Sequence, residues 1–432
     1  GVGSGFDEKT LAALAKTLLA MGRDTSPFEP KPRGVKRHWV EPRLVAEVSF
    51  GEWTPDGHVR HAVFHALRDD KDPGTIIREQ PAPTRAVAAG AKQESESIAP
   101  AAKRRSAGAT AARAAPAATT PPAAKTTGKR ASADASVEGI RISHPERVID
   151  ASTGLTKLDV VNYYLEASRL ILPHLIKRPV SMVRAPAGIS GQLFFQRHAE
   201  TLKIPELRQL DPKISPDHAA MVEIDSFTAL IGAAQANVIE LHTWNATTRD
   251  MTRPDRMIFD LDPGEGVSWQ AIQEGTELMH ALLDELGLAS FLKTSGGKGL
   301  HVVVPIAAKE DWDAVKAFSK VVVEHLAAVI PDRFVAKSGP KNRIGRIFVD
   351  YLRNGFGATT ACAWSVRARP GLGVSVPCAW EELKGLSGGA HWSVGNVHER
   401  IEERLDPWAG YAAAAKQTLA AARKRLASVV AA

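Results

Sequence analysis

The spacing of apolar and polar residues changes along the chain and predicts different elements in different regions. After about residue 136, apolar residues recur at helical spacing in 267–288 and 312–330. Short runs rich in Val, Ile, Phe and Leu lie between and around these helices, at 256–262, 299–306 and 346–352, and are typical of strands. This succession of strands and helices predicts an α/β (α+β) fold. The Ala-rich stretch 410–432 predicts a terminal helix.

The N-terminal region has a different pattern, with one helical segment at 9–21 and apolar strand-like runs at 38–50 and 61–67. Residues 53–57 contain Pro55-Asp56-Gly57, a combination that favours a turn between the strands. We therefore expect a small, mainly β barrel with one helix.

A third region, 84–136, consists of Ala, Pro, Thr, Ser, Lys and Arg with almost no large apolar residues. Such a segment cannot bury enough surface to offset the entropy lost on ordering, so we expect a disordered linker. Its Lys103-Arg104-Arg105 run could contact DNA phosphates, but a solvated tether is the favoured interpretation. The expected domains are therefore 1–83, 84–136 and 137–432.

Composition narrows the class of protein. The formal net charge of +7 favours a polyanionic partner, although an Arg-rich proteome would give the same value. The two cysteines, Cys362 and Cys378, have no metal-ligand spacing, which argues against a disulfide framework or zinc site and fits a reducing cytoplasm. No apolar run reaches the roughly 18 residues needed to cross a membrane. We expect a cytoplasmic monomer with no membrane partner.

The strand pattern at 256–262 carries the most informative chemistry. Because side chains alternate along a strand, Asp260 and Asp262 point to the same face while Phe259 and Leu261 point into the core. Two adjacent carboxylates repel each other unless a cation lies between them, and Mg²⁺ or Mn²⁺ is held in this way for phosphoryl transfer. Asp350 ends another apolar run. Taken alone, each Asp could instead be a turn or cap residue.

The segment Lys293-Thr294-Ser295-Gly296-Gly297-Lys298-Gly299-Leu300-His301 lies between two strand patterns. Its glycines let backbone N–H groups approach a phosphate, and Ser295, Lys298 and His301 add a hydroxyl, a cation and an imidazole. Lys298 is followed by Gly rather than Ser or Thr, so this is not a Walker A loop. A tight hairpin with a solvated Lys is the alternative.

Further motifs in the same region are Ser143-His144-Pro145-Glu146-Arg147-Val148, Gly154-Leu155-Thr156-Lys157, Phe194-Phe195 and Glu240-Leu241-His242-Thr243-Trp244. Together with the order of carboxylate pair, phosphate loop and lone carboxylate, they resemble the archaeo-eukaryotic primase superfamily. More narrowly, residues 143–405 resemble the polymerase domain of bacterial ligase D, the multifunctional end-joining DNA ligase. In polymerase-β-like nucleotidyltransferases, by contrast, the Gly-Ser motif precedes the paired aspartates.

The resemblance implies a role for each matching residue. It makes Asp260, Asp262 and Asp350 the catalytic ligands of two divalent ions, Mn²⁺ or Mg²⁺. It assigns NTP or dNTP binding to Ser295, Lys298, His301, His242, Arg353 and Arg367. It assigns DNA binding to Arg147 and Lys157, at a 5′-phosphate across a gap, and to Phe194 and Phe195, by stacking. One departure is Cys362-Ala363-Trp364, where the family usually has Ala-Pro-Tyr.

The N-terminal region resembles the C-terminal OB-fold of an ATP-dependent DNA ligase through Val2-Gly3-Ser4-Gly5-Phe6, His38-Trp39-Val40 and Arg68-Asp69-Asp70-Lys71. The Lys-x-Asp-Gly motif that carries a ligase's nucleotidyl-acceptor lysine is absent from the chain. We therefore expect no sealing activity, and we interpret the sequence as a ligase–polymerase fusion truncated within its ligase part.

The resemblance implies template-directed nucleotide addition to a primer 3′-OH, filling short gaps during non-homologous end joining. It also implies a preference for ribonucleotides, bacterial Ku as a partner and a location at the nucleoid. A primase that starts chains de novo is one alternative, which the 5′-phosphate residues Arg147 and Lys157 disfavour. A DNA-end-binding scaffold with an inactive site is another, which the complete set of site residues disfavours. A metal-dependent nuclease leaves the phosphate loop unexplained.

Overall fold

The computed structural model describes residues 2, 8–28, 38–49, 52–53, 59–60, 62–68, 73–75, 135–197, 204–214 and 220–431. The predicted linker lies outside the described residues except for its last two. Residues 3–6, 54–57 and 69–71 of the N-terminal motifs also lie outside them. None of the helices in the described segments is long and apolar enough to cross a membrane.

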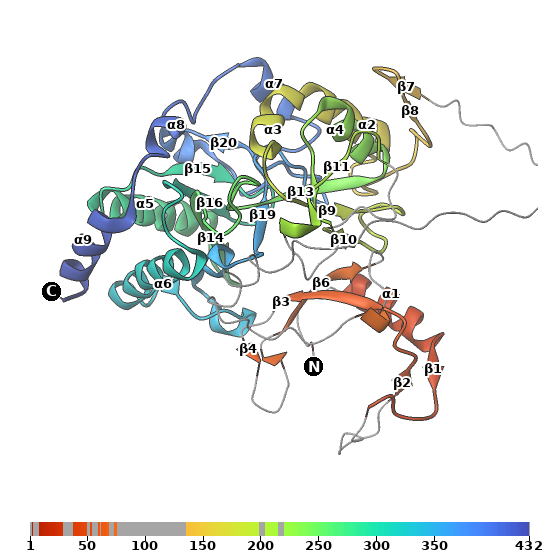
Figure 1. Ribbon diagram of the computed structural model, residues 1–432, viewed down its shortest axis with the longest axis horizontal. Coiled ribbons are helices and arrows are strands. Elements are labelled where there is room, and N and C mark those ends of the chain that lie inside the picture. Colours follow the sequence, from red (N-terminus) through yellow and green to blue (C-terminus); the bar gives the residue numbers. More distant parts are fainter. Residues whose placement is uncertain are drawn as a thin grey trace, which may run out of the picture. The chain divides into compact units, whose positions relative to one another are not determined.

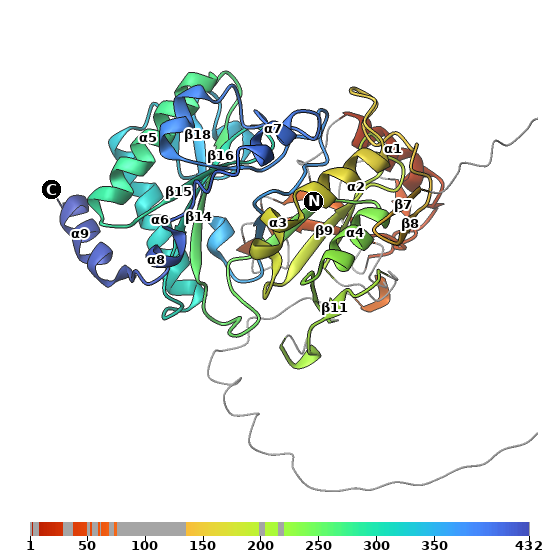
Figure 2. The same cartoon turned by 90° about the horizontal axis from the view of Figure 1, so that it is seen from above.

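A six-stranded sheet carries the predicted aspartates. Its order is β17 (Phe334–Val335), β18 (Ile347–Asp350), β14 (Arg256–Pro263), β16 (Leu300–Pro305), β15 (Phe291–Thr294) and β20 (Pro377–Cys378). All neighbours are antiparallel except β17 and β18. Helices α5 (Trp269–Glu285) and α6 (Trp312–Val329) lie beside it and share its apolar core (Figure 2).

A second sheet is built around β9 (Val180–Arg184). Its further strands are β10 (Phe194–Gln196), β11 (Arg208–Gln209), β12 (Val222–Glu223), β13 (Val238–Trp244), β19 (Thr359–Ala361), β3 (Val45–Ser49) and β6 (Val63–Arg68). Helices α2 (Lys157–Glu166), α3 (Ser168–Leu175) and α4 (Phe227–Gln235) pack on it around a second core (Figure 1). Two sheets with their own helix layers fit the predicted mixed α/β class.

Several shorter elements lie outside the two sheets and their helix layers. They are the β7 (Ala135–Val137) and β8 (Ile140–Ile142) hairpin, α7 (Val397–Glu402), and the 3₁₀ turns η1 (Pro73–Thr75), η3 (Pro212–Ile214), η4 (Pro340–Asn342), η5 (Leu352–Asn354) and η6 (Trp380–Gly385).

The N-terminal region contains α1 (Glu8–Leu19), as the helical pattern predicts. Its strands pair as β1 (Gly22–Arg23) with β2 (Trp39–Val40), β3 with β6, and β4 (Glu52–Trp53) with β5 (Val59–Arg60). Trp53 is therefore a strand residue opposite Val59 rather than the first turn residue. Among the described residues these strands close no barrel, so this part of the prediction is not met.

The observed helix boundaries follow from capping. The prediction of a helix at 267–288 is too long at both ends, because Ser268 accepts a hydrogen bond from Ala271 N and starts α5 at Trp269. At the other end Gly287 has φ +73°, and a residue in this left-handed conformation ends a helix. Asp311 caps α6 through Ala314 N in the same way as Ser268.

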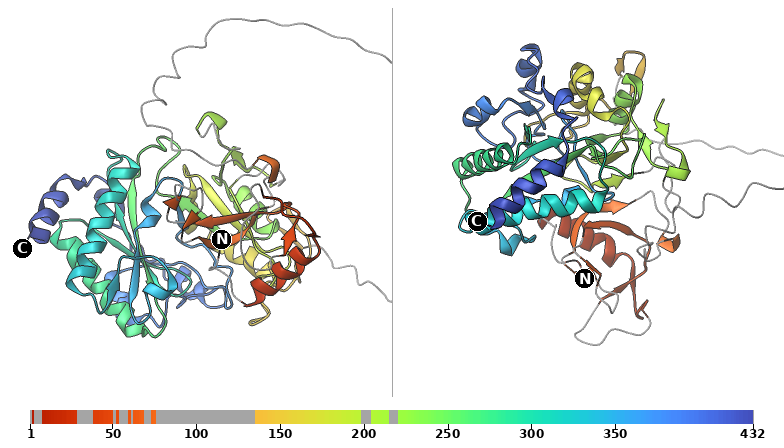
Figure 3. Two further views of the ribbon diagram at one scale, coloured as in Figure 1. Left: turned by 90° about the horizontal axis from the view of Figure 1, so that it is seen from below. Right: turned by 60° about the vertical axis from the view of Figure 1, so that its left-hand side comes forward.

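The predicted terminal helix is two helices, α8 (Tyr411–Ala414) and α9 (Leu419–Ala431), with α9 lying along α6 (Figure 3). The interruption has a local cause in Gln417. Its Nε2 donates to Pro305 O at 2.6 Å and to Ala289 O at 2.9 Å, and its Oε1 accepts from Ala289 N at 2.9 Å. These bonds fix the chain against the sheet, where a continuous helix would carry it away.

We expect Gln417→Ala to lower the free energy of unfolding by about 1 kcal/mol, because it removes three hydrogen bonds, of which the one to the partly buried Pro305 carbonyl leaves its acceptor unpaired. Urea unfolding measures the change, and hydrogen exchange should become faster in α9 than in α5. The control is Gln270→Ala, which removes only an exposed contact with Glu274. Equal stability of the two variants would contradict this account of the interruption.

Candidate active site

Four polar side chains form a row across the six-stranded sheet. Strand pairing places His301 of β16 and Asp350 of β18 on either side of Asp260, and places Lys293 of β15 beside His301. Paired residues of adjacent strands project to the same face, so the row Lys293–His301–Asp260–Asp350 lies on one surface. All four side chains are buried. The structure therefore brings together residues as far apart in the sequence as Asp260 and Asp350, which are separated by 90 positions.

The aspartates have basic neighbours as well as each other. Asp260 Oδ1 lies 3.3 Å from His301 Nε2, and Asp350 Oδ2 lies 3.0 Å from Arg353 Nε. Asp262 Oδ2 is 3.1 Å from Arg343 Nη1. As the alternation predicts, Phe259 and Leu261 are fully buried on the opposite face. Arg343 was not predicted, because its place beside Asp262 depends on how the long β17–β18 connection folds.

The three carboxylates differ in their affinity for protons. Burial raises the pKa of Asp262 to about 6, and the neighbouring Asp260 adds to this rise. Burial also raises the pKa of Asp350, with Asp260 contributing. The pKa of Asp260 is lowered despite its burial, because His301 and Arg353 stabilise its charge. The site thus concentrates negative charge that it only partly compensates.

The donor set fits a divalent cation. Three carboxylates on adjacent strands are the hard oxygen ligands that Mg²⁺ and Mn²⁺ prefer, and a cation would relieve the repulsion felt by Asp262. As the described side chains stand, no three His, Cys, Asp or Glu residues are close enough to hold a metal ion. The Arg343 and Arg353 guanidinium groups lie against the carboxylates instead.

The phosphate-loop candidate, 295–299, is organised by its own serine. Ser295 Oγ accepts hydrogen bonds from Gly297 N at 3.1 Å and Gly299 N at 3.2 Å. A Cβ on Gly299 would come 1.9 Å from the Leu261 carbonyl oxygen, so only glycine allows this approach to β14. Lys298 is exposed, so its ammonium is accessible to a ligand.

A second polar cluster adjoins the loop and centres on Glu240. Glu240 Oε2 lies 2.6 Å from His242 Nε2 and accepts from Arg367 Nε at 3.0 Å, while Oε1 accepts from Ala368 N at 2.7 Å. Arg367 Nη1 also donates to Ser295 O at 2.7 Å. Glu240, for which the sequence predicts no role, therefore joins His242 and Arg367, and Arg367 joins them to the loop.

Arg367 contacts Glu240 and Ser295 although the family's usual Ala-Pro-Tyr is replaced by Cys362-Ala363-Trp364. Trp364 has φ +66°, and this strained backbone is held because Trp364 O accepts from the Tyr163 hydroxyl at 2.7 Å and Trp364 N donates to Ser375 O at 2.6 Å. Ser365 Oγ then accepts from Leu241 N at 2.8 Å, which ties this turn to the strand that carries Glu240.

The two phenylalanines predicted to bind DNA do not lie side by side. Adjacent strand residues point to opposite faces, so Phe194 and Phe195 cannot both present their rings to one surface. Phe195 is buried and its ring centroid lies 6.1 Å from that of His242, edge to face. Phe194 is half-buried. Only Phe195 is therefore brought to the Glu240 cluster.

Arg147 and Lys157 form a separate basic site. Lys157 Nζ is buried and donates to Ser143 O at 2.8 Å, and Arg147 Nη1 donates to Pro186 O at 2.8 Å. The pKa of Lys157 is lowered to about 8, mainly by burial and in smaller part by the positive charge of Arg147. Two mutually repelling cations favour an anion between or beside them.

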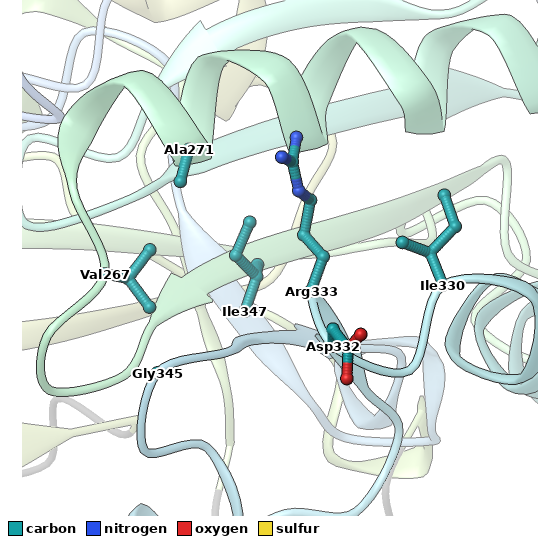
Figure 4. A pocket seen from close by; sticks show the side chains of 7 residues that line it. All are labelled: Val267, Ala271, Ile330, Asp332, Arg333, Gly345 and Ile347. Carbon is teal, nitrogen blue, oxygen red and sulfur yellow. The ribbon is translucent and has the colours of Figure 1, made fainter.

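A cavity of about 320 Å³ lies near the start of α5 (Figure 4). It is lined by Val267, Ala271, Ile330, Asp332, Arg333, Gly345 and Ile347. Ile347 and Asp350 are an odd number of residues apart on β18, so they point to opposite faces of the sheet. This cavity therefore opens away from the aspartate row.

Comparisons with known proteins agree on one family. Residues 156–408 match the family model for the LigD primase-polymerase domain, and residues 1–71 match that for the ATP-dependent DNA ligase C-terminal region. The multifunctional non-homologous end joining protein LigD of Pseudomonas aeruginosa is 43% identical over 98% of this chain and 47% of its own length. That of Mycolicibacterium smegmatis is 30% identical over 57% of this chain and 32% of its own.

The chain thus spans less than half the length of these two relatives. Among solved structures, the polymerase domain of Mycobacterium tuberculosis Ligase D in complex with DNA is 27% identical, with a TM-score of 0.56. The match covers 62% of this chain and 96% of that one.

We expect Asp262→Asn to raise the free energy of unfolding of the metal-free protein at pH 7.5 by about 1 kcal/mol. Folding raises the pKa of Asp262 to about 6, so at pH 7.5 its negative charge destabilises the folded protein relative to the unfolded one. The partial exposure of the side chain limits the effect. Urea unfolding in the presence of a chelator measures it. Glu285→Gln, on the exposed face of α5, is the control and should change nothing. A destabilised Asn variant would show that the pair with Arg343 outweighs the repulsion.

Proposed function

Because the chain belongs to the LigD primase-polymerase domain family, we propose that it adds nucleotides to the 3′-OH of a template-paired DNA strand. The reaction would fill short gaps at broken DNA ends, with release of pyrophosphate. The observation that carries the proposal is the buried row Lys293–His301–Asp260–Asp350 with Asp262 at its edge. A row of carboxylates beside a glycine-rich loop suits the transfer of a phosphoryl-linked group.

Different residues of the chain would bind the metal ions and the nucleotide. Asp260, Asp262 and Asp350 would hold two divalent ions, Mn²⁺ or Mg²⁺, which supply charge neutralisation at the 3′-oxygen and the α-phosphate when bound. Lys298 and the N–H groups of the loop would bind the triphosphate. We assign Ser295 to holding the loop's shape, because its hydroxyl already accepts two loop hydrogen bonds.

The remaining nucleotide-binding residues would act from both sides of the loop. His301 would keep Asp260 oriented through their 3.3 Å contact. Arg353, Arg367 and His242 would contact phosphate or sugar oxygens. When the carboxylates take up cations, Arg343 and Arg353 lose their present partners and become available to the nucleotide.

The template and the far side of the gap would be bound by other residues than the carboxylates. Arg147 and Lys157 would hold the 5′-phosphate on the far side of a gap, since their mutual repulsion is relieved by an anion. Phe195, whose ring meets that of His242 edge to face, would stack on or pack against the template, and Phe194 would contact DNA from the opposite face of β10. We propose in addition a preference for ribonucleotides, participation in non-homologous end joining at the nucleoid, and Ku as partner.

The aspartates should be essential for extension. On a gapped duplex with Mn²⁺ and nucleotides, we expect the Asp260→Ala/Asp262→Ala double variant and Asp350→Ala to lose extension by about a thousandfold or more, as loss of a metal-binding carboxylate removes the neutralising charge. Asp284→Ala on α5 is the control and should remain active. Comparing ribo- with deoxyribonucleotides tests the sugar preference. Tight DNA binding by the parent without any extension would instead favour a scaffold, and extension without a primer a primase.

Stimulation by the 5′-phosphate should depend on pH. Lys157 has a pKa of about 8, below its ordinary value, so it is charged below pH 8 and loses its proton as the pH rises above 8. We expect a 5′-phosphate across the gap to stimulate extension at pH 7 and to do so several-fold less at pH 9. Lys157→Arg stays protonated and should keep the stimulation at pH 9. The same duplex without the 5′-phosphate controls for effects of pH on chemistry; equal stimulation at both pH values in the parent would contradict the loss of the Lys157 proton in this range.

A further inference from the structure

We propose that Glu240 is a positioning residue that sets the orientation of both His242 and Arg367 toward the nucleotide. This inference rests on the proposed polymerase function and deepens it. Glu240 would not touch the nucleotide itself. It would act by fixing the two side chains, and through Arg367 the phosphate loop, before the nucleotide arrives.

The carboxylate is fully committed to this arrangement. It is buried on β13, and both its oxygens accept hydrogen bonds, from His242 and Arg367 on Oε2 and from Ala368 N on Oε1. Arg367, in turn, donates hydrogen bonds from Nε to Glu240 and from Nη1 to Ser295 O. The guanidinium has five N–H donors, so Nη2 and the second N–H of Nη1 could reach a ligand. Removing Glu240 would free the guanidinium to rotate and would loosen its hold on the loop.

The contacts of Glu240 also favour its charged form. Burial alone would raise the pKa of Glu240, yet Arg367 and His242 hold it well below its usual range. Burial lowers the pKa of His242 despite the contact with Glu240, and Arg367 contributes to this. The imidazole is therefore held as a hydrogen-bonding group of fixed orientation beside an ionised carboxylate.

The neutral isostere distinguishes positioning from packing. In Glu240→Gln one oxygen becomes an NH₂ group. If it replaces Oε1, it faces the Ala368 N–H; if it replaces Oε2, it faces the Arg367 Nε–H. Both of these groups can only donate, so one hydrogen bond is lost in either rotamer while the side chain keeps its volume. Loss of a charge-assisted bond corresponds to about a tenfold to hundredfold weaker interaction.

The experiment compares the parent, Glu240→Gln and a matched control, Glu223→Gln. Glu223 is likewise a fully buried carboxylate, on β12, and it accepts from Lys177 N. Three quantities are measured: extension kinetics on a gapped duplex, the Kd for a non-hydrolysable nucleoside triphosphate with Mn²⁺ by calorimetry, and the Kd for gapped DNA. We expect the Gln variant at 240 to raise the nucleotide KM and Kd about tenfold or more, with kcat changed less and DNA affinity unchanged. The control should keep the parent's nucleotide KM.

Each outcome has a distinct meaning. A folded Glu240→Gln variant with the parent's nucleotide KM and Kd would overturn the positioning role while leaving the proposed function intact. A uniform loss of active protein with unchanged KM, matching that of the Glu223 variant, would also overturn it. If the Gln variant does not fold by circular dichroism, Glu240→Asp takes its place, because it keeps the charge but withdraws the oxygens; a parental KM in that variant would again overturn the role. Absence of extension by the parent would count against the proposed function itself.

Discussion

The antiparallel register of β14 with its two neighbours is the constraint on which the candidate site depends. Because β14 pairs with β16 on one side and β18 on the other, Asp260 is fixed opposite both His301 and Asp350. A slip of one residue in either pairing would turn the partner side chain to the opposite face, into the apolar core under α5 and α6. The core residues Phe259 and Leu261, fully buried on the face opposite the aspartates, specify this register. The packing energy of the sheet and the geometry of the carboxylates are therefore set by the same strand.

Much of this arrangement follows from local pattern. The alternation of Phe259, Asp260, Leu261 and Asp262 is enough to assign opposite faces, and apolar periodicity is enough to find α5 and α6. Residues that act through pairing of distant strands are less accessible. Lys293 stands three strands from Asp350, and nothing in its neighbours indicates that it ends in the same row. Arg343 reaches Asp262 through a long connection whose path depends on tertiary contacts.

Glu240 shows a different limit of prediction from the sequence. A single Glu in an apolar strand is visible in the sequence, but its partners Arg367 and Ala368 come from 127 and 128 residues further along the chain. The break between α8 and α9 is similar, because an Ala-rich stretch has high helix propensity, and the bonds of Gln417 to Pro305, Ala289 and Ala307 come from distant segments. In both places the structure depends on hydrogen bonds between segments that are distant in the sequence.

The ion pairs that Arg343 and Arg353 make with the aspartates have a consequence for how ligands enter. In the proposed function, a cation bound by the carboxylates would release two guanidinium groups, and a triphosphate bound by the guanidinium groups would release the carboxylates. Each ligand thereby removes part of the cost that the other would meet, so their affinities are thermodynamically linked, and by equal factors in both directions. If the proposed function holds, the site would therefore favour a cation and a triphosphate together over either ligand alone.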